Sequence, residues 1–270
     1  MGLKITDLQV ANYMTAYPVS VQPSVPFADA VNFMTSRCIG NLIVSEGKEP
    51  IGIFTEREIL KHVVLGKAKS DVPVKDIGIQ PFVKITPDID ILTAAKTMIS
   101  KKSRLLVFVN GDKLVGIITA SDMLRAFRKT DDAPPLDKVS STKVYMCSKD
   151  DTILDAATLM HEKRIGSVII NEKLLYKIFT ERDLLVHVLV NEVNLNGKVI
   201  DYASSPLIKA NYGIVGNKAA GIMVANNIKR LPLTKDDQLA GMITARDLVE
   251  AFQSTYQLEN PYLKESAKIT

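Results

Sequence analysis

The sequence contains no tryptophan and only two cysteines, and aromatic residues make up 6% of its 270 residues. Two separated thiols, Cys38 and Cys147, supply neither a disulfide framework nor a metal cluster, so a reducing cytoplasm is the simplest setting. The scarcity of aromatic side chains weakens any interpretation based on platforms that stack nucleic-acid bases.

Long apolar runs are also missing. No stretch reaches the roughly 18 apolar residues that a membrane span requires, and residues 1–7 lack the apolar run of a signal peptide. We therefore expect a cytoplasmic protein without membrane association. The net charge is +4, from 34 basic and 30 acidic residues. Such a small excess permits anionic ligands without requiring nucleic acid.

The sequence does contain an internal repeat of about sixty residues. A threonine that ends an apolar run, followed three positions later by Asp or Glu, recurs at intervals of 64, 61 and 64 residues. An Ala-x-x-x-Met phrase precedes each threonine, with its Met 20 or 21 residues upstream. Positions i and i+4 share one helical face, so these phrases predict four amphipathic helices with buried methionines. The four pairs are Ala30 and Met34, Ala94 and Met98, Ala156 and Met160, and Ala219 and Met223.

Each repeat has the pattern of a small α/β unit. Between the helix and the threonine lie two strand-like runs around a polar turn, for example 42–44 and 51–54 around the turn 45–50. A short strand precedes the first helix, and an apolar helix follows the threonine. The predicted order is therefore strand, helix, strand, strand, helix, and the fold class is α/β (α+β).

The four repeats alternate between two kinds. Repeats one and three share Phe-Thr-Glu-Arg, whereas repeats two and four share Ile-Thr-Ala and carry Arg104 and Arg230 upstream. This alternation predicts that neighbouring repeats form the older unit, which was then duplicated across the proline-containing linker. The predicted domains are 1–130 (repeats about 8–66 and 74–128), a linker at 131–136, 137–254 (repeats about 138–190 and 197–253), and a C-terminal tail at 255–270.

The repeat, which closes on Gly, two apolar residues and Thr-x-x-Asp, resembles the cystathionine-beta-synthase (CBS) domain. Repeat four matches most closely, where residues 240–248 read A-G-M-I-T-A-R-D-L, and the resemblance covers about residues 8–253. It implies that paired repeats form two Bateman modules, which often associate into a flat disc, either within one chain or in a homodimer. It also implies a regulatory protein, similar in plan to the gamma subunit of AMP-activated protein kinase, that signals to an unidentified effector protein. The implied ligand is AMP, ADP, ATP or S-adenosylmethionine, bound between paired repeats.

The Thr-x-x-Asp phrase has a physical reason to bind such a ligand. A threonine at the start of a helix lies beside free N–H groups and the positive end of the helix dipole, which suit a phosphate. An ionised aspartate can accept two hydrogen bonds from the 2′ and 3′ hydroxyls of a ribose. The same phrase is also a capping box that only satisfies the helix end. We expect all four copies to cap helices and two of them to bind ligand as well.

The predicted site residues fall into three groups. For the ribose they are Asp247, Asp122, Asp183 and Glu58, of which Asp247 ranks first and Glu58 last because its longer side chain would misplace the hydroxyl pair. For the phosphate they are Thr244, Arg246, Thr119, Ser121, Thr180, Arg182, Thr55, Arg230 and Arg104, although the last two arginines would also suit a solvated hairpin edge. For the apolar wall around the base they are Val83, Ile208, Val19, Tyr145 and Pro232.

Common catalytic motifs do not occur in the sequence. It has no H-E-x-x-H, C-x-x-C, Walker loop or G-x-S-x-G phrase, so we expect neither an enzyme nor a required metal or cofactor. Two alternatives to a ligand sensor stay open at this point. The mild basic excess would suit a nucleic-acid-binding protein, whose affinity would fall steeply with salt. An assembly scaffold would use the four threonine phrases only as helix caps.

Overall fold

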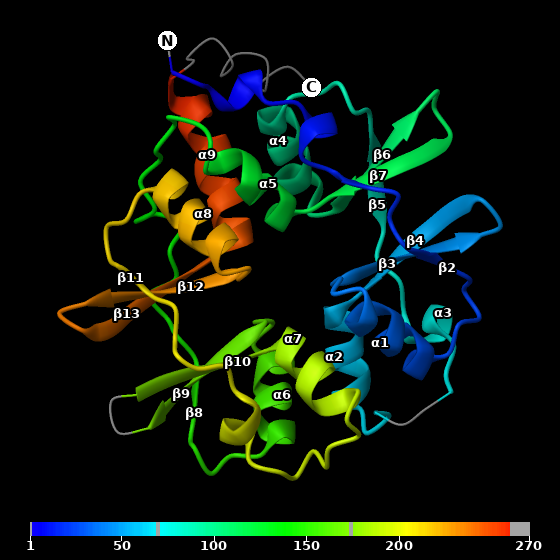
Figure 1. Cartoon of the computed structure of the whole chain (residues 1–270), viewed down its shortest axis with the longest axis vertical. Coiled ribbons are helices and arrows are strands. Elements are labelled where there is room, and N and C mark those ends of the chain that lie inside the picture. Colours follow the sequence, from blue (N-terminus) through cyan, green and yellow to red (C-terminus); the bar gives the residue numbers. More distant parts are fainter. Residues whose placement is uncertain (1, 69–70, 173–174, 260–270) are drawn as a thin grey trace. The chain divides into compact units, whose positions relative to one another are not determined.

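The computed structural model describes residues 2–68, 71–172 and 175–259, which form two compact units. Unit 1 comprises the described parts of Met1–Pro18, Phe82–Lys143 and Ile208–Thr270, and unit 2 comprises those of Val19–Pro81 and Val144–Leu207. Unit 1 therefore combines repeats two and four with the N-terminal segment, whereas unit 2 combines repeats one and three (Figure 1). The sequence predicts that neighbouring repeats pair into modules at 1–130 and 137–254, and this pairing stays a prediction.

Unit 2 contains two three-stranded sheets, in the orders β2-β3-β4 and β10-β9-β8. Its elements from residues 19–81 are β2 (Ser20–Val21), α1 (Phe27–Ser36), β3 (Asn41–Glu46), β4 (Glu49–Thr55), α2 (Glu56–Val64) and α3 (Val74–Ile77). Its elements from residues 144–207 are β8 (Met146–Cys147), α6 (Ile153–Glu162), β9 (Ser167–Glu172), β10 (Leu175–Thr180), α7 (Glu181–Asp183), η3 (Leu184–Leu189) and η4 (Val199–Tyr202).

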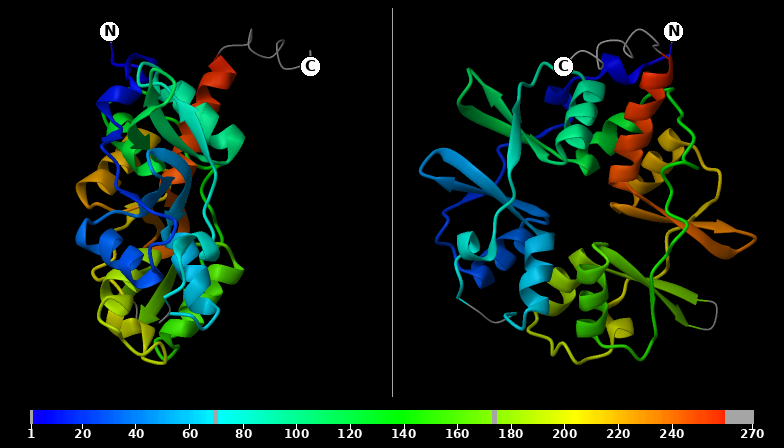
Figure 2. Two further views of the ribbon diagram at one scale, coloured as in Figure 1. Left: turned by 90° about the vertical axis from the view of Figure 1, so that its right-hand side faces the viewer. Right: turned by 180° about the vertical axis from the view of Figure 1, so that it is seen from behind.

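Unit 1 contains sheets with the orders β1-β7-β6-β5 and β11-β12-β13. Its N-terminal segment holds η1 (Ile5–Asp7), η2 (Val10–Asn12) and β1 (Thr15–Ala16). Repeat two supplies β5 (Phe82–Ile85), α4 (Ile91–Lys101), β6 (Arg104–Val109), β7 (Lys113–Ile118) and α5 (Ala120–Phe127), and repeat four supplies β11 (Ala210–Asn211), α8 (Gly216–Ala225), β12 (Arg230–Lys235), β13 (Gln238–Thr244) and α9 (Ala245–Glu259). Helices α4, α5, α8 and α9 lie side by side in both the front view and the rear view (Figures 1 and 2).

The predicted order within each repeat, strand, helix, strand, strand, helix, is confirmed by the structure. A short strand pairs in parallel with the first strand of an antiparallel hairpin, as β5 does with β6 and β11 with β12. The predicted turn at 45–50 is wrong in extent, because β3 continues to Glu46 and β4 begins at Glu49. Ser45 is buried and its hydroxyl lies 2.6 Å from that of Ser20, so the strand gains a polar partner where the sequence suggested a turn.

The second helix of repeat three departs from the other repeats. After one turn of α-helix in α7, the chain continues as a π-helix through η3, whereas α2 in repeat one is regular. Two histidines at matching sequence positions, one in each of these helices, also differ in surroundings. His62 is buried against Phe27, with ring centroids 4.7 Å apart, whereas the His187 side chain is 53% exposed.

Each unit has one hydrophobic core to which both of its repeats contribute. The four Ala-x-x-x-Met pairs lie in these cores as predicted, and all eight side chains are at most 4% exposed. In unit 1 the rings of Phe127 and Phe252 stack with centroids 4.1 Å apart and planes 9° apart. Both are at most 1% exposed, so this stack joins α5 to α9 at the centre of the core. None of the helices within the described ranges is both long and apolar enough to cross a membrane.

Candidate functional site

The four threonines all cap helices, as the sequence predicts. In each repeat the threonine backbone N–H and hydroxyl both donate to the carboxylate three residues later. The N–H to carboxylate distance is 3.1 Å for Thr55 and 2.8 Å for Thr119, Thr180 and Thr244. One carboxylate oxygen in every repeat is therefore occupied by the cap, and only the other oxygen is left to bind something else.

In three repeats the second oxygen is occupied by a side chain from another part of the same unit. Each donor lies in the segment that leads into a neighbouring repeat. The donors and acceptors are Gln80 to Glu58 (2.8 Å), Thr15 to Asp122 (3.1 Å) and Ser204 to Asp183 (2.9 Å). Both aspartates also have a basic side chain nearby: Arg125 lies 3.1 Å from Asp122, and His187 lies 3.7 Å from Asp183.

The donors reach the carboxylates because these lead-in segments pair with the strand that ends at the threonine. The paired positions are Thr15 with Ile117, Gln80 with Ile53, Ser141 with Met242 and Ser204 with Ile178. Strand glycines allow the close approach: a Cβ atom added to Gly241 would lie 2.9 Å from the carbonyl oxygen of Ser141. In repeat three Lys177 replaces this glycine, and its ammonium donates instead to the carbonyl of Ile200 at 3.5 Å.

Asp247 in repeat four differs from the other three carboxylates. Its Oδ2 accepts from Thr244, but its Oδ1 has no hydrogen-bond partner among the residues that the structure describes. The equivalent lead-in residue, Ser141, donates to the carbonyl of Lys143 instead. Burial raises the pKa of Asp247, and the two bonds from Thr244 and the nearby Arg246 only partly oppose that rise. Asp247, which is half-buried, is therefore the capping carboxylate that has most to gain from a new hydrogen-bond donor.

The predicted phosphate-binding arginines lie in different surroundings. Arg246 is exposed in the first turn of α9. Arg182, by contrast, donates to the carbonyl of Cys38 at 3.0 Å and pairs with Glu56 at 3.2 Å. Since that guanidinium already has partners within unit 2, we leave Arg182 out of the site proposed below.

The remaining predicted residues flank the four caps. Arg230 pairs across the β12–β13 ladder with Thr244, and Arg104 stands at the start of β6; both are half-buried and make further interactions. Ser121 is half-buried in the first turn of α5. The predicted wall residues Val19, Val83, Tyr145 and Ile208 are half-buried, whereas Pro232 is buried within β12.

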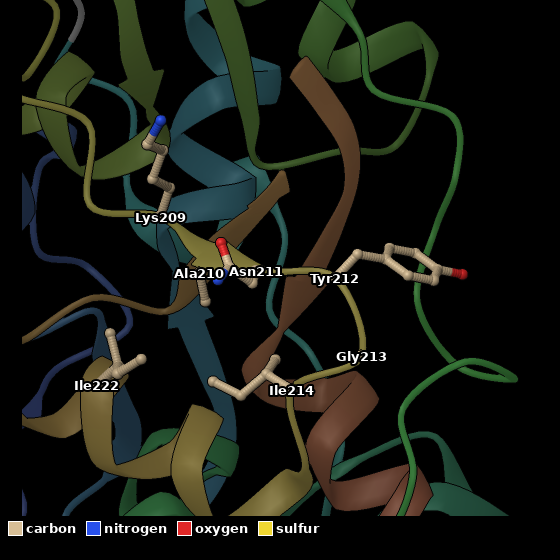
Figure 3. Close-up of a pocket in the computed structure, with 7 residues that line it drawn as sticks. All are labelled: Lys209, Ala210, Asn211, Tyr212, Gly213, Ile214 and Ile222. Carbon is tan, nitrogen blue, oxygen red and sulfur yellow. The ribbon is translucent and has the colours of Figure 1, made fainter. Parts of the chain in front are cut away.

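A separate pocket in unit 1 has a volume of about 540 Å³ and is open to solvent. It is lined by Lys209, Ala210, Asn211, Tyr212, Gly213, Ile214 and Ile222. Figure 3 shows the side chains of Lys209 and Tyr212 pointing away from the two isoleucines, in different directions. None of the four capping carboxylates belongs to this lining, so the pocket does not mark the candidate site.

The two thiols should differ sharply in reactivity. Burial raises the pKa of Cys147 to about 11, and the nearby Asp151 and Asp155 carboxylates act in the same direction, whereas Cys38 is exposed. Because the thiolate is the reactive form, we expect an aromatic disulfide reagent at about pH 8 to modify one thiol per native chain and both thiols after unfolding in urea. The Cys38→Ser variant should lose the fast native reaction. Fast modification of that variant would contradict the buried position of Cys147.

Comparison with known proteins shows which family the four repeats match. The family model described as "CBS domain" matches residues 10–65, 74–129, 136–190 and 199–254. The uncharacterized protein MJ1225 of Methanocaldococcus jannaschii is 26% identical over 209 residues, which cover 70% of this chain and 74% of MJ1225. The uncharacterized protein MK0525 of Methanopyrus kandleri is 40% identical over 95 residues, 34% of this chain, and the match spans only about half of MK0525 (48%).

Two solved structures share the fold over most of the chain. The crystal structure of MJ1225 superposes with a TM-score of 0.75 and 20% identity, covering 91% of this chain and 100% of that one. An uncharacterized conserved protein from Pyrococcus horikoshii gives a TM-score of 0.64 and 19% identity over the same shares. At these identities the likeness concerns the fold.

Proposed function

Because the chain belongs to the CBS-domain family, with four such domains in tandem, we propose that it is a non-enzymatic regulatory protein that binds an adenosine-containing ligand and signals to a partner protein. The ligand class is AMP, ADP, ATP or S-adenosylmethionine. One relative supports a regulatory role, since MJ1225 was solved as a candidate archaeal homolog of g-AMPK.

The observation that carries the proposal is the half-occupied carboxylate of Asp247. A ribose offers two adjacent hydroxyl donors, and an ionised carboxylate can accept from both. In repeats one, two and three the chain itself fills this role with Gln80, Thr15 and Ser204. In repeat four, within the described residues, no side chain does so. Repeat four is therefore the primary site, and a stoichiometry of one ligand per chain is expected.

The charges around Asp247 also suit a phosphorylated ligand. The carboxylate lies in the first turn of α9, near the positive end of the helix dipole, and the exposed Arg246 precedes it. A phosphate on the ligand could approach both the helix start and this guanidinium. Hydroxyl donors from the ligand would stabilise the ionised carboxylate, so binding should lower the raised pKa of Asp247 and release protons wherever that group is partly protonated.

Titration calorimetry on the full chain tests the proposal. The protein is first stripped of carried-over small molecules by unfolding, dialysis and refolding, and is then titrated separately with AMP, ATP and S-adenosylmethionine. We expect saturable heat with at least one of them, close to one site per chain. Mass spectrometry of small molecules released from the unstripped protein provides an independent check. If no ligand gives heat and no adenosine compound is released, the proposal is wrong.

A further inference from the structure

Two reciprocal ion pairs join the repeats of unit 2. Helices α2 and α7 both begin with Glu-Arg, and each arginine reaches the glutamate of the other helix. Arg57 Nε lies 3.0 Å from Glu181 Oε1, and Arg182 Nε lies 3.2 Å from Glu56 Oε1. Both glutamates are buried, at 6% exposure, whereas the arginine side chains are 35% and 31% exposed. Each of these buried carboxylates therefore pairs with a guanidinium from the opposite repeat.

Each arginine also holds the end of the other repeat's first helix. Arg57 donates to the carbonyl oxygens of Ile165 at 3.1 Å and Arg164 at 3.4 Å, just after α6. Arg182 donates to Cys38 at 3.0 Å and Ile39 at 3.4 Å, just after α1. Carbonyls at a helix C-terminus carry partial negative charge and attract cations. The same guanidinium thus binds a buried carboxylate and a helix end.

The matching positions of unit 1 cannot form this arrangement. There the helices begin with Ala120-Ser121 and Ala245-Arg246, so neither supplies a carboxylate at the first position. The two repeats meet instead through the stacked rings of Phe127 and Phe252. Equivalent helix starts therefore supply paired charges in unit 2 but not in unit 1, although both repeats of each unit also share an apolar core.

We propose that Glu56, Arg57, Glu181 and Arg182 form a charge clasp that specifies the pairing of repeat one with repeat three. A buried ion pair contributes little net stability, but removing one partner is costly because it leaves a buried, uncompensated charge. A repeat beginning Ala-Ser or Ala-Arg, placed opposite α2, would supply no glutamate to pair with Arg57, and one beginning Ala-Ser would also supply no arginine to pair with Glu56. The clasp therefore disfavours wrong pairings.

A suppressor experiment on the full chain tests the clasp. Arg57→Met keeps the apolar stem but removes the guanidinium that pairs with the buried Glu181, so we expect Tm to fall by about 6–12 °C. Adding Glu181→Gln removes the buried charge, and the double variant should recover at least about half of that loss. A merely steric role for Arg57 predicts no recovery. The matched control is Arg246→Met, at the same motif position in repeat four, which should change Tm by no more than about 2 °C.

A second test uses hydrogen exchange in the unaltered protein, so it does not depend on whether the variants fold. It shows which unit is weakened when salt screens the ion pairs. In the unaltered protein, raising the salt from about 0.05 to about 1 M should speed exchange several-fold in α2 and α7, because screening weakens partly exposed pairs. Exchange in α5 and α9 should change by less than half as much. Equal salt effects in the two units, or a double variant no more stable than Arg57→Met, would overturn the clasp.

Discussion

Replacing Asp247 with Asn is expected to weaken binding of the adenosine ligand by about 10- to 100-fold. The change removes a charged acceptor of ribose hydroxyls, and hydrogen bonds to charged groups are worth about 1.5–3 kcal/mol each. Glu58→Gln, at the same position in repeat one, should change the affinity by less than about threefold, because Gln80 already occupies that carboxylate. Calorimetric titration of both variants measures the difference.

Stability measurements on Asp247→Asn show whether a loss of affinity comes from loss of the binding site or from loss of the fold. Burial raises the folded-state pKa of Asp247 above its unfolded value. Because the ionised form is then disfavoured in the folded state, its cost is largest above the folded pKa and disappears as the pH falls below the unfolded pKa. Asp247→Asn removes that cost, so at about pH 7 the variant should be at least as stable to urea as the parent. A larger loss of affinity in Glu58→Gln than in Asp247→Asn would reject our choice of site.

Replacing Phe127 with Ala is expected to lower the free energy of unfolding of unit 1 by about 3–5 kcal/mol. The ring is fully buried and stacks on Phe252, so its removal loses apolar burial and leaves a cavity between α5 and α9. Space for repacking is small: a Cβ atom added to Gly216 in α8 would already lie 2.9 Å from the Phe252 ring. Urea denaturation, monitored by hydrogen exchange in α5 and α9, measures the effect.

The control for this variant is Phe33→Ala on α1 of unit 2. That side chain is 41% exposed, so its removal should cost less than about 1 kcal/mol. A cost for Phe127→Ala below about 1.5 kcal/mol, or one equal to that of Phe33→Ala, would mean that the stack does not hold the two repeats of unit 1 together.

The sequence contains enough information to predict the repeat, its order of elements and its helix caps. The Ala-x-x-x-Met pairs and the threonine phrases report local rules, namely helical periodicity and satisfaction of helix N–H groups, and these rules act within a few residues. For the same reason the sequence alone carries the resemblance to the CBS domain, and the family match confirms it. The sequence does not distinguish the π-helix in repeat three from the α-helix in repeat one, because residues 181–189 (ERDLLVHVL) closely resemble residues 56–64 (EREILKHVV).

The sequence could not predict which carboxylates the chain itself fills. Thr15, Gln80 and Ser204 act on carboxylates far away in the sequence, and sequence spacing says nothing about which repeat a lead-in segment will reach. One signal was present: a polar residue stands three or four positions before the first strand's wall residue in every repeat. The sequence likewise does not reveal the partners of Arg182 within the chain, because Cys38 and Glu56 lie in another repeat.

The two core units do not coincide with the two halves of the sequence, and this affects how the chain can be divided. Each core draws on one repeat from each half. A break within residues 131–136 would therefore leave two fragments, each holding half of both cores and completing neither. The sequence predicts that the two halves arose by duplication of one pair of repeats, whereas each hydrophobic core is built from both halves. Neither half therefore carries a whole hydrophobic interior of its own.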